Sequence, residues 1–451
     1  MNVFHYLRDV KLGKVSVRDT IEGILKEAKK INKTHHYFNK ISEDLAVKQA
    51  KVIDKNPKGR LAGLPVSVKD CICVKDVEST SGSKILSGYK PVKNATVVQR
   101  LIDEGAIIIG KTNQDEFGFG SFNVNVGLDK KIPKNPYDNN RVTGGSSGGA
   151  AGFTAMTKFP HVAISESTGG SINCPASFCG VIGFTPTYGV VSRYGLIDYA
   201  NSLDKIGVMG KDIQDVKIVF DVINGHDPKD STSVKEKLLK PKKNKKIGLI
   251  KGISVDKEVE DVFIQHTDKL KVKEISLPFT SKYGLAAYYT IAMAEASTNL
   301  AKFCGMRYGL ELDLKEGYND YFTKVRSEGF GAEAKRRIIL GTFTRMAGYR
   351  DAYYLKAMKI RTLIIEEYKK AFKKFDLLIS PTMPIIAPKF SDVKKLSPLK
   401  HYQMDMLTVG PNLAGLPHSS VNIGEAKGMP VGMQFISDHL QDYNLLEEFK
   451  I

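Results

Sequence analysis

Short apolar runs that alternate with longer amphipathic segments constrain the fold of this chain most. Five runs are rich in β-branched residues and are too short to be ordinary helices. The segments between them, such as residues 95–105 and 257–270, have their apolar positions at helical spacing. This alternation predicts an α/β protein with a largely buried sheet core flanked by helices. The runs are Leu64–Val68, Gly105–Gly110, His161–Ser165, Ile247–Ile250 and Asp376–Ser380.

The order of the segments also predicts the domain organisation. The chain has 451 residues and shows neither an internal repeat nor a low-complexity linker. Residues 1–60 have a mainly helical pattern. Residues 282–372 form a second helical stretch, after which the strand pattern resumes near Phe375. We therefore expect one domain over residues 1–451, with the stretch 282–372 as a helical insertion.

Composition excludes several classes of protein. Hydrophobic residues make up 42% and charged residues 26%, as in globular proteins in water. No apolar run approaches the roughly 20 residues that span a bilayer, and the charged N-terminus lacks a signal-peptide core. The five cysteines form no CxxC pair, so neither a disulfide framework nor a metal site is predicted. We expect a cytoplasmic protein without membrane contact.

The net charge of +18 would suit a nucleic-acid partner, because a basic surface attracts phosphates. The densest lysine run is residues 235–246. No aromatic-rich recognition module accompanies it, so the charge does not predict base-specific contacts.

Two loops rich in glycine and serine lie close together in the chain. The first reads TGGSSGG at Thr143–Gly149, and the second reads STGGSINCP at Ser167–Pro175. The first loop fits the GxSxG pattern of a nucleophile elbow, but the preceding segment holds two prolines and no strand leads into it. This context argues against an α/β-hydrolase with His418 or His439 as its base.

A third glycine pattern, GAIIIGKT at Gly105–Thr112, matches the P-loop of ATP-binding proteins letter for letter. A phosphate-binding loop needs flexible residues between its two glycines. Here the intervening residues are Ala-Ile-Ile-Ile, which form a strand pattern themselves. We therefore expect no ATP site at this motif.

A serine activated by a lysine accounts for both serine-containing loops. Lys69 follows the apolar run Leu64–Val68, where burial would favour the neutral amine that a general base requires. Ser171 follows two glycines and precedes Pro175, which can open a helix. The glycines allow several main-chain N–H groups to converge on one oxygen, as in an oxyanion hole. Because serine–lysine pairs serve as nucleophile and base in known hydrolases, we expect this chemistry here.

The same residues resemble the amidase-signature hydrolases. Members of that family carry a lysine in a GxPxxxKD strand, a GGSSGG loop and a TGGSIRxPA loop. The corresponding segments here read GLPVSVKD at Gly63–Asp70, GGSSGG at Gly144–Gly149 and TGGSINCPA at Thr168–Ala176. The resemblance implies a large mixed β-sheet flanked by helices and a Ser–cis-Ser–Lys triad.

Carried over to this sequence, the triad consists of Ser171 as nucleophile, Ser146 as the serine that relays protons after a cis peptide bond, and Lys69 as base. No metal takes part. The oxyanion hole would be formed by the loop residues Thr168, Gly169, Gly170 and Ser171.

This chain departs from the family pattern in the second loop. Asn173 stands where the pattern has arginine, and the spacing between Ser146 and Ser171 is one residue longer than usual. The acidic residue of the pattern is correspondingly displaced to Glu166. The longer spacing leaves Ser147 open as an alternative to Ser146.

Blocks outside the signature resemble the A subunits of glutamyl-tRNA(Gln) and aspartyl-tRNA(Asn) amidotransferases. The resemblance implies that glutamine is hydrolysed here and that the ammonia passes to a partner B subunit. That partner, with ATP and Mg²⁺, would convert glutamyl-tRNA(Gln) to glutaminyl-tRNA(Gln), and a small C subunit would brace the complex. No cofactor is expected in this subunit. The matching blocks include residues 110–121, 186–207, 225–233, 288–309 and 326–343.

The resemblance also implies contacts for the zwitterionic end of glutamine. Arg337 would bind the carboxylate and Asp405 the ammonium, with Tyr288 as a further contact. A stand-alone amidase for small free amides is the alternative enzyme. A nucleic-acid-binding scaffold with a decayed amidase site is the alternative from another class.

Overall fold

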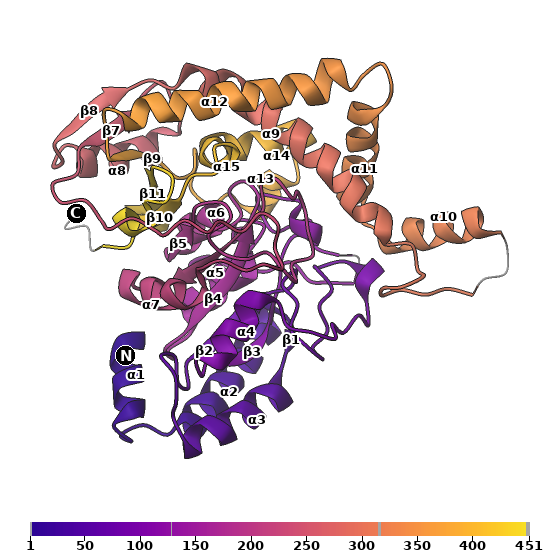
Figure 1. The fold of residues 1–451 in the computed structure, drawn as a ribbon, viewed down its shortest axis with the longest axis vertical. Coiled ribbons are helices and arrows are strands. Elements are labelled where there is room, and N and C mark those ends of the chain that lie inside the picture. The colour runs from indigo at the N-terminus through magenta and orange to yellow at the C-terminus, as the bar shows by residue number, and fades with distance from the viewer. Residues whose placement is uncertain (1, 128, 314–316, 448–451) are drawn as a thin grey trace.

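The computed structural model describes residues 2–127, 129–313 and 317–447. Within these ranges the core is one sheet of 11 strands in the order β1-β3-β2-β4-β6-β5-β10-β11-β9-β7-β8 (Figure 1). The strands are β1 (Phe38–Ile41), β2 (Pro65–Lys69), β3 (Ile107–Thr112), β4 (Val162–Ser167), β5 (Ile182–Thr185), β6 (Lys205–Gly210), β7 (Ile247–Ile250), β8 (Val272–Ile275), β9 (Leu377–Pro381), β10 (His418–Ala426) and β11 (Met429–Ser437).

The sheet is mixed, which confirms the predicted fold class. Strand β2 lies parallel to both β3 and β4, and β7 lies parallel to both β8 and β9. The remaining pairs are antiparallel. All five predicted strands exist, as β2, β3, β4, β7 and β9. Strands β2, β3, β4 and β9 are buried along their whole length, as expected of a sheet covered on both faces.

Helices flank the sheet along the whole chain. Residues 1–60 form three helices, but they also contain β1, which pairs with β3. The helices are α1 (Val3–Lys11), α2 (Val17–His35), α3 (Glu43–Lys55), α4 (Thr96–Asp103), α5 (Gly148–Met156), α6 (Asn173–Cys179), α7 (Ile213–Ile223), α8 (Lys257–Thr267), α9 (Pro278–Asn299), α10 (Tyr318–Gly329), α11 (Ala332–Arg345), α12 (Lys356–Phe372), α13 (Phe390–Val393), α14 (Pro398–Gln403) and α15 (Val409–Leu413).

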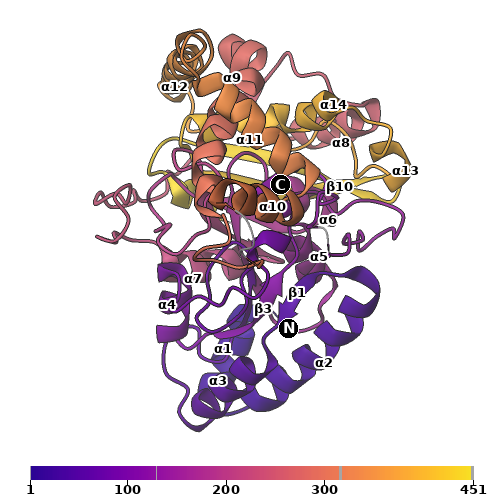
Figure 2. The same ribbon diagram turned by 90° about the vertical axis from the view of Figure 1, so that its right-hand side faces the viewer.

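Both ends of the molecule are helical, and α4, α5, α6 and α7 lie between these ends (Figure 1). Helices α1, α2 and α3 lie at one end, and α9 and α12 lie at the other (Figures 1 and 2). Helix α9 packs against both α11 and α12, whereas α10 projects sideways (Figure 1). Helix α9 is buried on many sides, because it lies between those helices and α15. Over its described residues, the predicted helical stretch 282–372 corresponds to α9, α10, α11 and α12.

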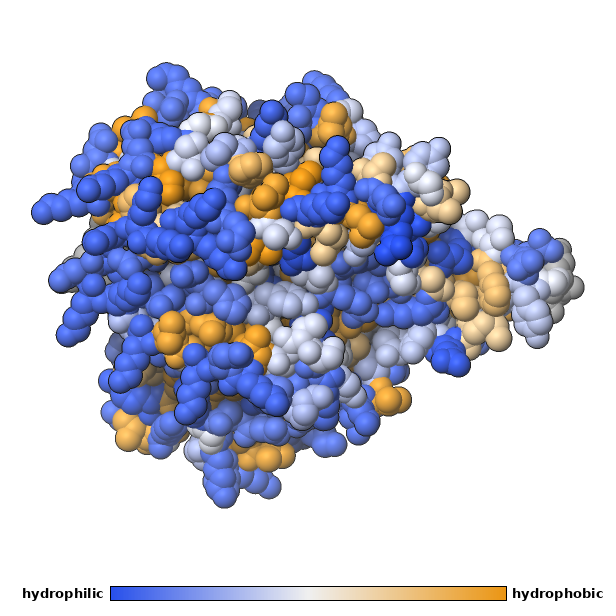
Figure 3. Space-filling view, turned by 45° about the horizontal axis from the view of Figure 1, so that its top comes forward, coloured by the Kyte–Doolittle hydropathy of each residue, from blue (hydrophilic) through white to orange (hydrophobic). Residues whose placement is uncertain are grey.

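The surface is mainly hydrophilic on the face shown in Figure 3, with hydrophobic patches between long polar side chains. The charge of the chain is +18. Among the described residues, no helix combines the length and the apolar character needed to cross a membrane.

Candidate active site

Two strand ends and two helix starts meet at the predicted catalytic residues. Lys69 is the last residue of β2, and Glu166 lies one position before the end of β4. Because β2 and β4 are parallel neighbours, their carboxyl ends lie at the same edge of the sheet. Helix α5 begins directly after Ser147 and packs against both strands, and α6 begins shortly after Ser171 and packs against α5.

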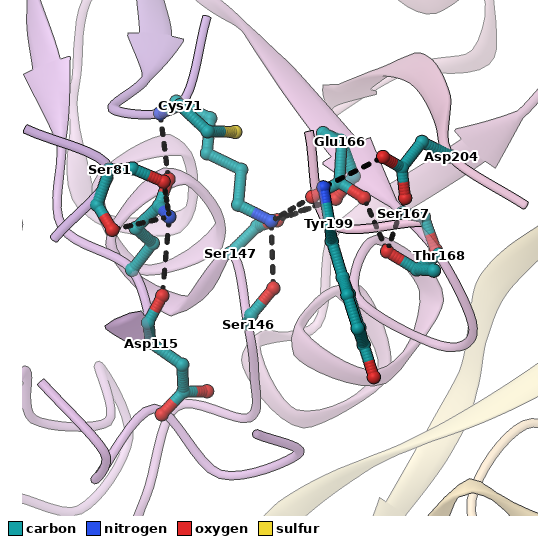
Figure 4. A network of polar contacts seen from close by, with 12 residues as sticks. Cys71, Ser81, Asp115, Ser146, Ser147, Glu166, Ser167, Thr168, Tyr199 and Asp204 are labelled. Carbon is teal, nitrogen blue, oxygen red and sulfur yellow. Dashed lines mark hydrogen bonds and ion pairs between the residues drawn. The ribbon is translucent and has the colours of Figure 1, made fainter. Parts of the chain in front are cut away.

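Lys69 is fully buried and has three hydrogen-bond acceptors. Its Nζ donates to Ser146 Oγ at 2.7 Å, to the Glu166 main-chain oxygen at 2.9 Å and to Glu166 Oε2 at 2.9 Å. Figure 4 shows Ser146 and Glu166 close to each other in this network of polar contacts. Ser147 instead donates its hydroxyl to the Glu166 main-chain oxygen at 3.3 Å. Of the two candidate serines, Ser146 is therefore the one that contacts the lysine.

The peptide bond between Gly145 and Ser146 is cis. The loop around it is tightly packed, because a Cβ atom on Gly145 would lie within 2.6 Å of the Asn123 nitrogen. The main-chain oxygen of Ser146 also accepts a hydrogen bond from the Asp115 N–H at 3.1 Å. These contacts hold Ser146 against Lys69.

Ser171 differs from the other predicted triad residues in its exposure. It is 7% exposed, whereas Lys69 and Ser146 are 0% exposed. In the part of the chain that the structure describes, no hydrogen bond joins the Ser171 hydroxyl to Ser146. The structure thus brings Lys69 and Ser146 together, and none of the hydrogen bonds of the described residues connects Ser171 to them.

The predicted oxyanion loop is held from outside by two other segments. The Asn412 side-chain amide donates to the Gly169 main-chain oxygen, and a Cβ on Gly169 would lie 2.8 Å from the Tyr288 hydroxyl. Among the described residues, none accepts a hydrogen bond from the N–H groups of residues 169–171. These N–H groups, next to the start of α6, remain available to an anionic oxygen.

Thr168 connects the lysine to a second buried carboxyl group. Its Oγ1 lies 2.8 Å from Glu166 Oε1 and 2.9 Å from Asp204 Oδ1. Asp204 also accepts hydrogen bonds from the N–H groups of Tyr199 and Ala200. Figure 4 shows Glu166, Thr168 and Asp204 in one continuous network.

Asp405 lies in a second polar cluster next to this loop. Its Oδ1 accepts a hydrogen bond from the Ser121 hydroxyl at 2.8 Å, and its Oδ2 accepts one from the Tyr289 hydroxyl at 2.5 Å. Burial raises the pKa of Asp405, while these two hydroxyls and the positive charge of Arg337 oppose the rise. Asp405 is connected to the oxyanion loop through Thr408, which contacts both Asp405 and Gly170.

Arg337 lies in α11 within a cage of aromatic rings. Its guanidinium carbon is 4.9 Å from the ring centre of Phe119 and between 5.4 and 5.5 Å from those of three tyrosines. Its Nε donates to Glu333 Oε1 at 2.8 Å, and Glu333 also accepts from the Tyr402 hydroxyl. The three tyrosines are Tyr199, Tyr289 and Tyr402.

A cavity of about 310 Å³ opens beside Arg337 and Ser121, and the Ser121 hydroxyl donates to Asp405. Its size suits a small polar molecule such as an amino acid. Acidic and basic groups both face it, so it offers partners to an ammonium and to a carboxylate. Its polar lining includes Asp115, Ser121, Asn125, Glu333, Arg337 and Tyr402.

The competing motifs have structural roles. The P-loop-like segment forms strand β3, and Lys111 within it is fully buried. Lys111 Nζ donates to the main-chain oxygens of Asp70 and Ile72 and to the Ser79 hydroxyl. His418 is buried at the start of β10, next to the Leu416 main-chain oxygen. Over the described ranges, no cluster of residues suits a metal ion.

Sequence reasoning missed several side chains at this site. It named Glu166 only as a displaced residue, although its carboxylate contacts Lys69 directly. Ser121 and Asp115 fall within the block 110–121 that carries the resemblance, which marks their positions but gives them no role. Tyr199, Asp204, Tyr289 and Glu333 also fall within matching blocks, at 186–207, 288–309 and 326–343, but they lie outside the glycine-rich loops and no short motif marks their roles.

Known proteins are similar to this chain over nearly its whole length. A family model described as Amidase matches residues 19–446. The A subunit of the glutamyl-tRNA(Gln) amidotransferase of Archaeoglobus fulgidus is 45% identical over 441 residues, which are 96% of this chain and 95% of that protein. The protein of the same name from Trichodesmium erythraeum is 45% identical over 431 residues, covering 90% of this chain and 88% of its own length.

A solved structure agrees with these matches. The crystal structure of the A subunit of the glutamyl-tRNA(Gln) amidotransferase from Thermotoga maritima superposes with a TM-score of 0.80 at 33% identity, and the match covers 99% of this chain and 92% of that one. The family match includes both serine loops, the lysine strand and the cage around Arg337. The chain therefore belongs to the amidase family.

Proposed function

We propose that this chain is the glutamine-hydrolysing subunit of a tRNA-dependent amidotransferase. It releases ammonia from glutamine for the conversion of glutamyl-tRNA(Gln) to glutaminyl-tRNA(Gln). The observation that carries the proposal is the buried hydrogen bond of 2.7 Å between Lys69 Nζ, at the carboxyl end of β2, and Ser146 Oγ. The names of relatives that are 45% identical over most of the chain support the choice of substrate and reaction.

The reaction needs no group outside the chain. The Ser171 hydroxyl attacks the side-chain amide carbon of glutamine, and its proton passes through the Ser146 hydroxyl to the neutral amine of Lys69. N–H groups of residues 169–171 stabilise the negative oxygen of the tetrahedral intermediate. The proton returns through Ser146 to the leaving nitrogen, so ammonia departs and a glutamyl ester remains on Ser171. Water, deprotonated by the same route, hydrolyses the ester to glutamate.

Glutamine would be held at its α-carbon end in the cavity beside Arg337. We assign its carboxylate to Arg337 and its ammonium to Asp405, with Tyr288 as a further contact near the oxyanion loop. Both charged side chains are nearly fully buried, at 2% and 7% exposure, so their interactions with a bound zwitterion are screened little by water.

The later steps belong to other chains. A partner B subunit with ATP and Mg²⁺ would activate and amidate the tRNA-bound glutamate, and a C subunit would complete the complex. Buried Lys111 and the strand conformation of its segment support the view that ATP is not bound at the P-loop-like motif.

Replacement of Ser171 by alanine tests the proposal. The Ser171→Ala variant should lose glutamine hydrolysis and any glutamyl-enzyme detectable by mass spectrometry, while its thermal unfolding stays close to that of the parent. In the complex with B and C subunits, ammonium chloride should restore tRNA amidation, because the glutaminase step is then bypassed. Hydrolysis that survives in the variant, or an acyl group found on Cys174, would contradict the assignment.

Lys69 provides a matched pair of variants. Lys69→Arg should be nearly as inactive as Lys69→Ala, because a guanidinium cannot give up its proton at working pH. An active Lys69→Arg enzyme would show that another group is the base.

A further inference from the structure

Two buried carboxyl groups share one hydroxyl group next to the catalytic lysine. Thr168 Oγ1 lies within hydrogen-bond distance of both Glu166 and Asp204, at 2.8 and 2.9 Å. Both acids are almost fully buried, with Glu166 at 3% and Asp204 at 0% exposure. A hydroxyl group has a single hydrogen, so it can donate to only one of two carboxylates at a time.

The proton count of this network follows from that geometry. If both contacts of Thr168 are hydrogen bonds, one carboxyl group must be protonated and donate to Thr168 Oγ1. Two adjacent buried carboxylates would also repel each other strongly. One of the two acids is therefore neutral.

The neutral acid is Asp204. The other oxygen of Glu166 lies 2.9 Å from Lys69 Nζ, where a negative charge is stabilised by an ammonium. Asp204 has no cation within salt-bridge distance among the described residues, and its neighbours are main-chain N–H groups and Thr168. Burial and the charge of Glu166 both raise the pKa of Asp204 well above its usual value. The hydrogen bonds then run from Asp204 to Thr168 and from Thr168 to Glu166.

We propose that Glu166 is a positioning residue for Lys69, kept negatively charged by a Thr168 hydroxyl and a protonated Asp204. Its carboxylate holds Nζ against Ser146 Oγ and stabilises the ammonium that forms when Lys69 accepts the proton of the nucleophile. The inference rests on the proposed function, because it assigns Glu166 a role only through Lys69. It does not follow from the family pattern, in which the acidic residue occupies the next position of the loop.

This role has two opposite effects on the rate. The charge of Glu166 stabilises the ammonium relative to the neutral amine that accepts the proton, which opposes the start of the reaction. The same charge stabilises the transition state, in which Lys69 gains a proton, much as the aspartate of a Ser–His–Asp triad stabilises its imidazolium. Loss of the Glu166 charge should therefore shift the acid limb of the pH profile of kcat/KM to lower pH and reduce the plateau value of kcat.

Other titratable groups face the pair and must be separated from it. Burial raises the pKa of Asp115 to about 6 and raises that of Cys71 well above its usual value. Because Asp115 titrates near neutrality, a rate profile alone would mix two ionisations, and Lys69 must be observed directly. The charged and titratable groups that interact with Lys69, Glu166 or Asp204 are Cys71 after β2, Asp115 after β3, and Arg193 and Asp198 before β6.

The test compares Glu166→Gln with the parent enzyme by kinetics and by NMR of protein labelled with [ε-¹³C]lysine, with the Lys69 signal assigned from Lys69→Arg. Glutamine has the size of glutamate and keeps an oxygen acceptor, but it has no charge. We expect the Lys69 signal and the acid limb of kcat/KM for glutamine to titrate about 1–3 pH units lower in the variant. The plateau of kcat should fall about tenfold or more, with little change in KM. An unchanged titration of Lys69 would overturn the proposal.

Asp204→Asn is the matched control, because an asparagine amide imitates a protonated aspartate: its NH₂ donates to Thr168 and its oxygen accepts from the N–H of Tyr199. We expect Lys69 to titrate within about 0.3 pH units of the parent value, a much smaller change than a neighbouring charge produces. If instead Asp204→Asn lowers that titration, the charge lies on Asp204 and the proposal is wrong, whether or not Glu166→Gln folds. The NMR titration needs no turnover, so it separates this inference from failure of the proposed function, which Ser171→Ala tests.

Discussion

Replacement of Asp405 by asparagine removes one negative charge from the candidate glutamine site and leaves its size almost unchanged. The framework should survive, because the two partners of Asp405 are hydroxyl groups, from Ser121 and Tyr289. The asparagine oxygen can still accept from one hydroxyl, and its NH₂ can donate to the other once that hydroxyl rotates. The change therefore isolates the charge from the shape of the site.

The size of the effect follows from burial. Asp405 is 7% exposed, so an ammonium bound to it would be largely removed from water. Loss of one partner of such a charged pair costs about 2–5 kcal/mol. Asparagine keeps part of the hydrogen bonding, so the expected loss of binding free energy lies near the lower end of that range. We expect kcat/KM for glutamine to fall about 30-fold or more, since each 1.36 kcal/mol is a factor of ten.

The assay compares glutamine with butyramide, a simple amide that has no α-ammonium group. Asp405→Asn should leave the hydrolysis of butyramide within about twofold of the parent rate, because an exchange of buried charge affects only a charged ligand strongly. Tyr289→Phe is the matched control, since it removes a hydrogen bond to Asp405 but keeps the negative charge. It should affect glutamine less than Asp405→Asn does.

The pH dependence supplies a second measure. Burial raises the pKa of Asp405. Acidification should therefore protonate Asp405 in the parent enzyme and remove the same negative charge that Asp405→Asn removes. The preference for glutamine over butyramide should therefore decline as pH falls, and Asp405→Asn should lack this decline. If the variant lost activity equally toward both amides, Asp405 would have a structural role and our assignment of the ammonium site would be refuted.

Two further predictions concern buried groups outside the substrate cavity. Lys111→Met should lower the free energy of unfolding by about 3–5 kcal/mol, because it leaves Asp70 and two main-chain oxygens without their cation, and Tm should fall by about 3–5 °C for a chain of this length. ATP should not alter the Tm of the parent protein or of Lys111→Met. If the parent protein bound ATP and Lys111→Met did not, the result would instead support a P-loop. Burial lowers the pKa of His161 to about 3, so between pH 6.5 and 3 the unfolded chain binds a proton that the folded chain does not. Stability should therefore fall as the pH is lowered, with a loss from this group of about 2 kcal/mol between pH 7 and pH 5. Urea unfolding of His161→Gln should show a smaller loss over that interval, and equal losses would mean that His161 is protonated in the folded state.

Four of the five strands that the sequence predicted are buried along their whole length, but so are β6 and β11, which it did not predict. Strand β3 has three consecutive isoleucines, and β2, β4 and β9 are equally buried, so each produced an apolar run. The fifth, β7, is also an apolar run. Strand β10 was not identified, because it begins HSSVNIGEA and buries two serines, and β6 starts with buried Lys205. Burial of polar residues in these strands depends on neighbours far along the chain, which no local pattern shows.

The candidate site likewise contains residues that short motifs identify and residues that only the tertiary fold brings together. Lys69 and Ser146 belong to short motifs, and the structure places them in contact. The cage around Arg337 takes aromatic rings from four separate segments, so only the tertiary fold creates it. The contact between Glu166 and Lys69 joins the ends of the neighbouring strands β2 and β4, so it forms only once these strands pair and cannot be read from spacing along the chain.

The order of the strands has a consequence for how the chain is made. Strands β1 to β6 come from residues 38–210, and β7, β8 and β9 come from residues 247–381, yet these two groups are not hydrogen-bonded to each other. The hairpin of β10 and β11, at residues 418–437, joins them by pairing with β5 on one side and β9 on the other. During synthesis, both groups therefore leave the ribosome with an open sheet edge, and such edges are prone to aggregate. The two parts can close into one sheet only after the hairpin emerges, so chaperone demand should be greatest just before that moment.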